Sequence, residues 1–360
     1  MWMPSVWESW SIKFSLNRGP EKIDSVTDQA QHLAVVVKGL MFSVPAWNIS
    51  EFRPIAAGRL MRSDCHSGKS VAPMNVNHRY VLEFARRFAS ESHNPQLRIL
   101  DFGCGGGAVV QQGLEEGLDI WGADLFQEHA SDRSGASRSG LLGSRIFEIR
   151  EGLVPWPAEH FDLVISNQVF EHVADLVAVV HEIHRVLKPG GRLLAVVPHS
   201  HMIFEVHSRL PFVHWFSRRS RVRLWWSLAM CRCLNRNDKG RSAREWTQHS
   251  LAWIDEFCFY RTPREIDRTL AAGFEVHHLE HEYAVFRRRY SRVWRIATPF
   301  SGTATRINGP ISRELGGLVV LGSKKSTGRP DWVDARNGFS SSPRPTASLE
   351  VRDLPGRPLP

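Results

Sequence analysis

The sequence has few cysteines, and they show no repeated spacing. The 360 residues include five cysteines, an odd number, so a framework of disulfides is not expected. Cys231 and Cys233 form only half of a zinc-binding pattern, because no second pair matches them. This cysteine usage favours a reducing, cytoplasmic setting.

Long apolar runs and lysine are also scarce. No apolar run reaches the ~18 residues that a membrane-spanning helix needs, and Lys38 interrupts the nearest one, residues 33–47. The N-terminus does not resemble a signal peptide. Only eight of the 46 basic residues are lysine, and the net charge of +9 is modest for a nucleic-acid binder, so nucleic acid is a disfavoured partner.

From residue 76 onward, strand-like and helix-like apolar patterns alternate, beginning with a helix over 75–90. The expected strands are residues 98–102, 118–125, 145–149, 161–167, 191–198, 275–283 and 315–325. Helices are expected at 108–116, at 174–187 and after the capping residue Thr262, and a Ser/Gly/Arg-rich loop at 131–140. Such alternation predicts an α/β fold: a doubly wound, mostly parallel, Rossmann-like seven-stranded sheet.

The pattern divides the chain into segments. Residues 1–75 show no motif and are taken as an N-terminal extension, whereas 76–325 form the predicted domain. Residues 199–260 break the alternation after the fifth strand and are expected to be a helical cap inserted there. Residues 326–360 are rich in Pro, Ser, Gly and Arg and are predicted to be a disordered tail.

The stretch DFGCGGGA (residues 101–108) places four glycines between a strand and a helix, where α/β sheets bind nucleotides. Gly103, Gly105 and Ala108 satisfy the dinucleotide fingerprint of NAD(P)-dependent oxidoreductases. Asp124 lies near the position where that fingerprint has an acidic residue, about 20 residues further along the chain. The same turn suits S-adenosylmethionine (SAM). A purely structural tight turn is the third alternative.

The surrounding motifs favour SAM. The stretches LDFGCGGG, GADL, PWPAEHFDLVISNQVFEHV and HRVLKPGGRLLAVVP together resemble class I SAM-dependent methyltransferases, of the small-molecule type found in ubiquinone-pathway and bacterial glycan-associated enzymes. The resemblance implies that Asp124 binds the ribose hydroxyls and that Glu151 replaces the usual adenine-binding aspartate. The implied cofactor residues are Asp101, Gly103, Cys104, Gly105, Gly107, Asp124, Leu125 and Asn167. A domain of this fold kept only as a non-catalytic scaffold is a further alternative.

Methyl transfer to a hydroxyl needs a general base, and O-methylation is favoured here over C-methylation. The candidate bases are His172, His201 and His207; for any one of them, a structural histidine is the competing interpretation. His201, Glu205 and His207 are too poor in acidic ligands for a magnesium-type site, so no metal is expected.

The insertion is basic and aromatic. Residues 209–244 hold ten basic side chains and one acidic one, Asp238, interleaved with tryptophan and phenylalanine. This pattern predicts an amphipathic helix over 212–230 that contacts the inner face of a membrane, although a solvated basic face over a Trp-rich core would look the same. The expected acceptor is a small molecule, with a glycan or a lipid-linked compound as the favoured class.

Overall fold

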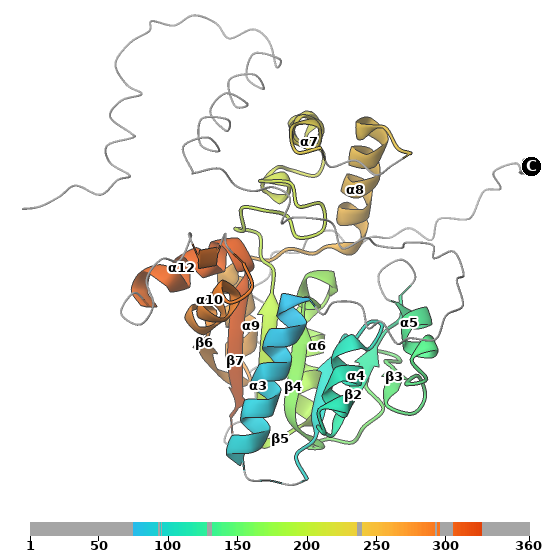
Figure 1. Ribbon diagram of the computed structural model, residues 1–360, viewed down its shortest axis with the longest axis vertical. Coiled ribbons are helices and arrows are strands. Elements are labelled where there is room, and N and C mark those ends of the chain that lie inside the picture. The colour runs from blue at the N-terminus through green and yellow to red at the C-terminus, as the bar shows by residue number, and fades with distance from the viewer. Residues whose placement is uncertain are drawn as a thin grey trace, which may run out of the picture. The chain divides into compact units, whose positions relative to one another are not determined.

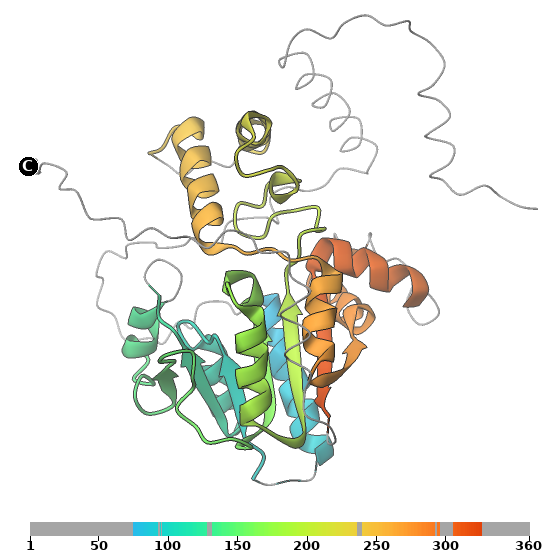
Figure 2. The same cartoon turned by 180° about the vertical axis from the view of Figure 1, so that it is seen from behind.

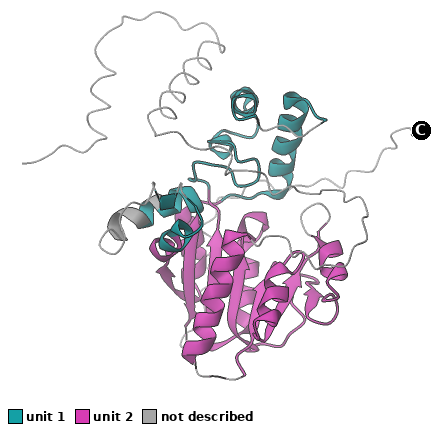
Figure 3. Cartoon of the chain, in the orientation of Figure 1, with its two compact units in different colours: residues 1–73, 200–260, 284–316 teal, residues 74–199, 261–283, 317–360 magenta. Residues whose placement is uncertain are grey.

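The computed structural model describes residues 75–92, 94, 96–127, 132–235, 240–291, 294–295 and 305–325. The expectations for the N-terminal extension and for the disordered tail fall outside these residues, apart from Asn75. The chain divides into two compact units, which Figure 3 colours separately. We call residues 74–199, 261–283 and 317–360 the sheet unit, and residues 1–73, 200–260 and 284–316 the insertion unit.

The sheet unit is built on a seven-stranded sheet in the order β3-β2-β1-β4-β5-β7-β6. Its strands are β1 (Ile99–Phe102), β2 (Ile120–Asp124), β3 (Ile146–Glu148), β4 (Phe161–Asn167), β5 (Leu187–Val197), β6 (Phe274–His278) and β7 (Leu318–Lys324). The first five pair in parallel, and β7 runs antiparallel to both β5 and β6. The predicted doubly wound, mostly parallel sheet is confirmed.

Helices cover both faces of this sheet. α3 (Val76–Ser92) and α4 (Ala108–Glu115) lie on the face turned to the viewer in Figure 1, and α6 (Leu176–Val186) and α9 (Pro263–Ala271) on the face seen in Figure 2. Burial on both faces explains the near-continuous apolar strands, in which β1 is buried along its whole length. Leu100, Val164 and Leu193 are fully buried side chains of this core.

The helix starts follow the capping rules. Asp175 accepts a hydrogen bond from the backbone N–H of Ala178 at the start of α6. Thr262 and Glu265 form the predicted capping box of α9, with Pro263 at its first turn.

Three sequence expectations are wrong. The predicted loop at 131–140 contains α5 (Arg133–Arg138), because the side chain of Asp132 caps it by accepting from the Gly135 N–H. The predicted strand over 275–283 is split between β6 and α10 (Glu280–Arg288), so its alternation holds only for five residues. The predicted helix over 212–230 is instead a short 3₁₀ turn, Val213–Trp215, followed by α7 (Arg221–Cys233).

The insertion unit has its own apolar core. α7 and α8 (Ala243–Phe257) pack against each other, and their N-termini are capped by Ser220 and Ser242. α12 (Thr305–Gly316) also belongs to this unit. The buried core residues are Leu210, Val213, Trp226, Met230, Ile254 and Cys258. No helix in the described part of the chain is long and apolar enough to cross a bilayer.

Candidate functional site

The glycine-rich loop connects the end of β1 to the start of α4, and its glycines are required by geometry. Gly103 and Gly107 both have φ of 80°, in the left-handed region that glycine adopts most readily. A Cβ atom on Gly103 would lie 2.3 Å from Val169 Cγ2, and one on Gly107 would lie 2.3 Å from Ile146 Cδ1. The backbone can therefore pack this closely against β3 and the end of β4 only without side chains.

Gly105 differs from these two glycines. Its φ is 52°, and a Cβ atom added to it would meet no atom within 4 Å. Gly105 therefore borders open space, whereas Gly103 and Gly107 are packed against other segments. Such a position lets a ligand approach the backbone directly.

Asp124, at the end of β2, is positioned by two backbone N–H groups. Its Oδ2 accepts from Gly105 N at 2.8 Å, and its Oδ1 accepts from Phe126 N at 2.8 Å. A carboxylate has about four acceptor sites and binds a cis-diol well, so Asp124 is of the chemical type that holds the two hydroxyls of a ribose. Residues 125–127, which directly follow Asp124, are not helical, so Asp124 does not cap a helix.

Asp101 lies on β1 and is 3% exposed. Burial, together with the negative charge of Asp124, raises the pKa of Asp101 to about 7. Two buried acids at the ends of adjacent strands form a site that favours a ligand carrying positive charge. The sulfonium and ammonium groups of SAM match this requirement.

Cys104 and Leu125 flank these acids. Burial raises the pKa of the Cys104 thiol well above its usual value, so the side chain is a neutral thiol at physiological pH. Cys104 Sγ would lie 2.8 Å from a Cβ on Gly122, so it packs on β2. Leu125 is 54% exposed, an apolar surface directly after Asp124 that can cover a flat ring. Glu151, expected to replace an adenine-binding aspartate, is exposed in a turn with φ of 53°.

The end of β4 contributes a further polar side chain to the candidate site, that of Asn167. Asn167 Oδ1 is buried and has no hydrogen-bond partner among the described residues. A buried acceptor left unsatisfied costs about 1–3 kcal/mol, so this atom is suited to a donor on a ligand. His172 lies five residues later in a 3₁₀ turn, Phe170–His172, beside the fully buried Glu171.

Arg261 holds this turn, a role that the sequence analysis missed. Its guanidinium donates to the carbonyl of Phe170 at 3.1 Å and to those of Val173 and Ala174 at 2.7 Å each. No motif marks Arg261, because its partners lie about 90 residues earlier in the chain. The planar guanidinium with several donors suits a set of converging carbonyls better than lysine would.

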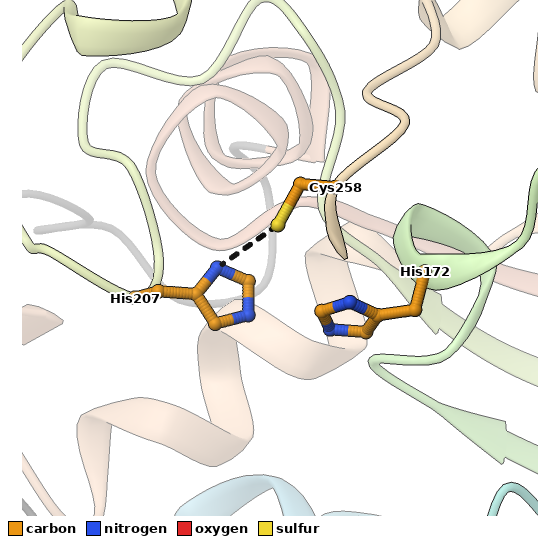
Figure 4. Close-up of side chains that lie close together, drawn as sticks. All are labelled: His172, His207 and Cys258. Atoms are coloured by element: carbon orange, nitrogen blue, oxygen red, sulfur yellow. Dashed lines mark hydrogen bonds between the residues drawn. The ribbon is translucent and has the colours of Figure 1, made fainter. Parts of the chain in front are cut away.

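The other candidate bases, His201 and His207, belong to the insertion unit. His201 is exposed. His207 Nδ1 lies 2.8 Å from Glu205 Oε1 and 3.7 Å from Cys258 Sγ (Figure 4). Of the three candidate bases, His172 belongs to the sheet unit, and His201 and His207 belong to the insertion unit. The candidate cofactor residues all belong to the sheet unit.

Comparison with known proteins agrees with this geometry. Residues 100–195 match the family model described as a methyltransferase domain. Residues 100–195 form a class I SAM-dependent methyltransferase domain. The cofactor of this family is SAM.

Two curated relatives have similar sequences over part of their length. The ubiquinone biosynthesis O-methyltransferase of Ruegeria pomeroyi is 36% identical over 110 residues, which are 30% of this chain and 44% of the relative. That of Dinoroseobacter shibae is 35% identical over 120 residues, 33% of this chain and 48% of the relative. The chain therefore spans less than half the length of the curated relatives it matches.

One solved structure with a similar fold is the geranyl diphosphate C-methyltransferase of Streptomyces coelicolor A3(2), in complex with Mg²⁺, geranyl diphosphate and S-adenosyl-L-homocysteine. The matched region covers 69% of this chain and 80% of the chain of that structure, with 17% sequence identity and a TM-score of 0.34. A likeness at this level carries no inference about the acceptor of the methyl group.

Proposed function

We propose that this protein is an enzyme that transfers the methyl group of SAM to an oxygen atom of a small molecule, with a glycan or a lipid-linked compound as the acceptor class. The observation that carries the proposal is the meeting of three features at the ends of β1, β2 and β4. These are the open space at Gly105, the two buried acids Asp101 and Asp124, and the unsatisfied Asn167 Oδ1.

Each residue has a distinct role in this proposal. Asp124 binds the ribose hydroxyls, Leu125 covers the adenine, and Asp101 and Asn167 bind the methionine end. When bound, SAM supplies an electrophilic methyl group that is already activated by its sulfonium. The enzyme must then hold the acceptor oxygen in line with that methyl group, and positioning supplies most of the catalysis.

A hydroxyl acceptor must also lose its proton. His172, His201 and His207 remain the candidate groups for this step. Support for oxygen over carbon comes from the printed name of the curated relatives, ubiquinone biosynthesis O-methyltransferase, and from the abundance of histidine in the insertion.

The experiment has two stages. Calorimetric titration of the full chain with S-adenosyl-L-homocysteine and, separately, with NAD identifies the cofactor; binding of NAD alone would overturn the proposal in favour of an oxidoreductase. Incubation with ¹³C-methyl SAM and fractionated polar-lipid or glycan extracts then detects the product. The ¹³C chemical shift of the transferred methyl separates an O-methyl from a C-methyl product, and cofactor binding without any product would favour a scaffold.

We also propose that the protein is cytoplasmic and that its basic segment 209–244 contacts the anionic inner face of a membrane. Trp215 and Trp225 are 54% and 58% exposed, and the arginines at 219, 221 and 232 of the same segment are also exposed. Exposed tryptophan with arginine suits the headgroup region of a bilayer. Arg223 does not contribute, because it is buried and paired with Asp255 at 2.7 Å.

Co-sedimentation with vesicles tests this surface. Vesicles of phosphatidylglycerol should bind the protein more strongly than vesicles of phosphatidylcholine, and Trp225→Ser should weaken the binding severalfold. Leu153→Ser is the matched control, because Leu153 is equally exposed but belongs to the sheet unit. Equal binding to both vesicles, or an equal loss in the control, would contradict a membrane-contacting role.

A further inference from the structure

Glu205 of the insertion unit has a fully buried side chain that accepts several hydrogen bonds. Its Oε2 accepts from the backbone N–H groups of His207 and Ser208. Its Oε1 accepts from His207 Nδ1 at 2.8 Å and from the hydroxyl of Tyr260. These four donors fill the acceptor sites of a carboxylate, so Glu205 itself has little capacity left for a ligand.

The contacts of this pair also determine its charge. Burial alone would raise the pKa of Glu205, but the hydrogen bond and charge of His207, the Tyr260 hydroxyl and the Ser208 N–H outweigh it and lower the pKa to about 2. Burial alone would lower the pKa of His207, but its contacts with Cys258 and Glu205 raise it to about 10. The pair is therefore a carboxylate and an imidazolium at neutral pH.

The ring of His207 has a fixed orientation. Nδ1 is committed to Glu205, the ring packs on Trp253 with centroids 4.8 Å apart, and Cys258 Sγ lies near Nδ1 (Figure 4). The side chain of His207 is still 27% exposed, so solvent and small ligands reach part of it. A carboxylate that holds one ring nitrogen orients the other, Nε2, on the opposite edge of the ring.

Four titratable side chains lie near the pair, namely Tyr260, His214, Cys258 and His172; one ligand atom each of His172, His207 and Cys258 lies within 4.8 Å of the others (Figure 4). Tyr260 donates to the same oxygen of Glu205, and the ring of His214 lies over the Tyr260 ring with centroids 5.1 Å apart. Burial lowers the pKa of His214, which keeps that ring neutral. His207 thus carries a positive charge in this cluster, and its side chain is partly accessible to a ligand.

We propose that the Glu205–His207 pair is an oxyanion-binding element of the acceptor site, in which His207 Nε2–H binds a phosphate or carboxylate group of the methyl acceptor. This inference rests on the proposed function and names a chemical class of acceptor for it. An imidazolium donates hydrogen bonds and cannot accept a proton, so this inference removes His207 from the candidate bases and leaves His172 and His201 for that role. Glu205 is a positioning residue, and Tyr260 supports it.

A second Glu–His pair in the chain provides a control. His278 Nδ1 lies 3.0 Å from Glu280 Oε1, with the same separation of two residues along the chain. His278 Nε2 is 3.6 Å from Asp267, so this ring lies between two carboxylates, an environment unsuited to an added anion. The variant Glu280→Gln therefore removes a comparable contact without touching the proposed element.

The experiment follows the histidine rings of the full chain by ¹H–¹⁵N NMR, with inorganic phosphate and glucuronate as the probes. His207→Gln assigns the signal. We expect His207 to stay doubly protonated at pH 8 and its Nε2 signal to shift on addition of a probe; the probe that binds more tightly separates a phosphate from a carboxylate acceptor. A His207 ring that titrates near 6.5, or a signal that neither probe shifts, would overturn the inference.

Glu205→Gln gives the sharper test, because its effect depends on pH. Without the carboxylate, the pKa of His207 should fall, because one of the two contacts that raise it is lost, so a smaller fraction of the ring is protonated at pH 8 and probe affinity at that pH drops severalfold from wild type. At pH 6, where most of the ring is again protonated, the affinity should return to within about twofold. A loss that is the same at both pH values would indicate a merely structural role and overturn the inference.

Two further variants separate the remaining outcomes. Glu280→Gln should leave the signal of His207 and its response to both probes unchanged. Tyr260→Phe removes a donor but keeps the charge of Glu205, so His207 should remain protonated at pH 8; this variant replaces Glu205→Gln if that one does not fold. Titration with S-adenosyl-L-homocysteine should be unaffected in all of them, so a failure of the cofactor assignment is recognised independently.

Discussion

The sheet unit and the insertion unit each bury an acidic site, and the two sites are electrostatic opposites. In the sheet unit, Asp101 and Asp124 are like charges, and the pKa of Asp101 rises to about 7. In the insertion unit, Glu205 is compensated by His207, and its pKa falls to about 2. Burial acts in the same direction on both acids, so the neighbours decide the result.

This difference indicates what each site lacks. The aspartate pair is short of a positive charge, and a cationic cofactor supplies one. The glutamate pair already contains its counter-ion and presents the positive member on its accessible side, so a ligand there should be negative. A buried charge thus predicts its ligand only once its protein partners have been identified.

The largest effect that tests the comparison is expected from Asp124→Ala. The affinity for S-adenosyl-L-homocysteine should fall at least about 100-fold, because two hydrogen bonds from the ribose to a charged acceptor are lost, each contributing about 1.5–3 kcal/mol. Isothermal titration calorimetry on wild type and variant measures it directly.

Asp119→Ala is the control for this variant. Asp119 directly precedes β2 at its other end and pairs with Arg145 at 2.7 Å, so its loss should leave the affinity unchanged. Because Asp124 also accepts from the Gly105 and Phe126 N–H groups, thermal unfolding is recorded alongside. A folded Asp124→Ala protein with wild-type affinity would contradict the role of Asp124 in ribose binding.

The next effect concerns pH and Asp101. A cationic ligand favours ionised Asp101, so protons compete with SAM below the pKa of about 7. Affinity for SAM should be highest above pH 7 and about tenfold weaker at pH 6 than at pH 8. Calorimetric titrations at a series of pH values give this curve.

Asp101→Asn should flatten the curve, since an amide does not titrate in this range. The insertion unit supplies the contrasting expectation, because Glu205 stays ionised down to about pH 2 and adds nothing to the pH dependence near neutrality. An unchanged slope in Asp101→Asn would assign the pH dependence to a different group.

The cofactor half of the site could be predicted from the sequence because its residues are close together in the chain and dictated by local geometry. Gly103 and Gly107 need positive φ, and Asp124 ends a strand adjacent to theirs. The capping box at Thr262 was likewise readable from four consecutive residues. Each of these signals is short-range, so no knowledge of tertiary contacts is needed.

The remainder depends on long-range contacts. Glu205 and Tyr260 are 55 residues apart, and Arg261 is about 90 residues from the carbonyls it binds, so no spacing rule connects them. The strand predicted over 275–283 failed because residues 280–288 continue as a helix whose first turn carries Glu280 and Glu282. Histidine and glutamate in 200–210 suggested chemistry, but only the fold shows which of them pair.

Arg261→Lys should have the smallest effect, and it tests whether the sheet unit's site depends on the chain that returns from the insertion. Lysine has one nitrogen and cannot serve the carbonyls of Phe170, Val173 and Ala174 together. Losing about one net hydrogen bond, about 1 kcal/mol, should speed amide exchange of residues 168–175 roughly fivefold. Hydrogen exchange with mass spectrometry measures this, and Arg264→Lys, an exposed neighbour in α9, is the control. If exchange in 168–175 stays at the wild-type rate while the protein is folded, this turn is held by the sheet unit's own core, and the candidate site forms independently of Arg261.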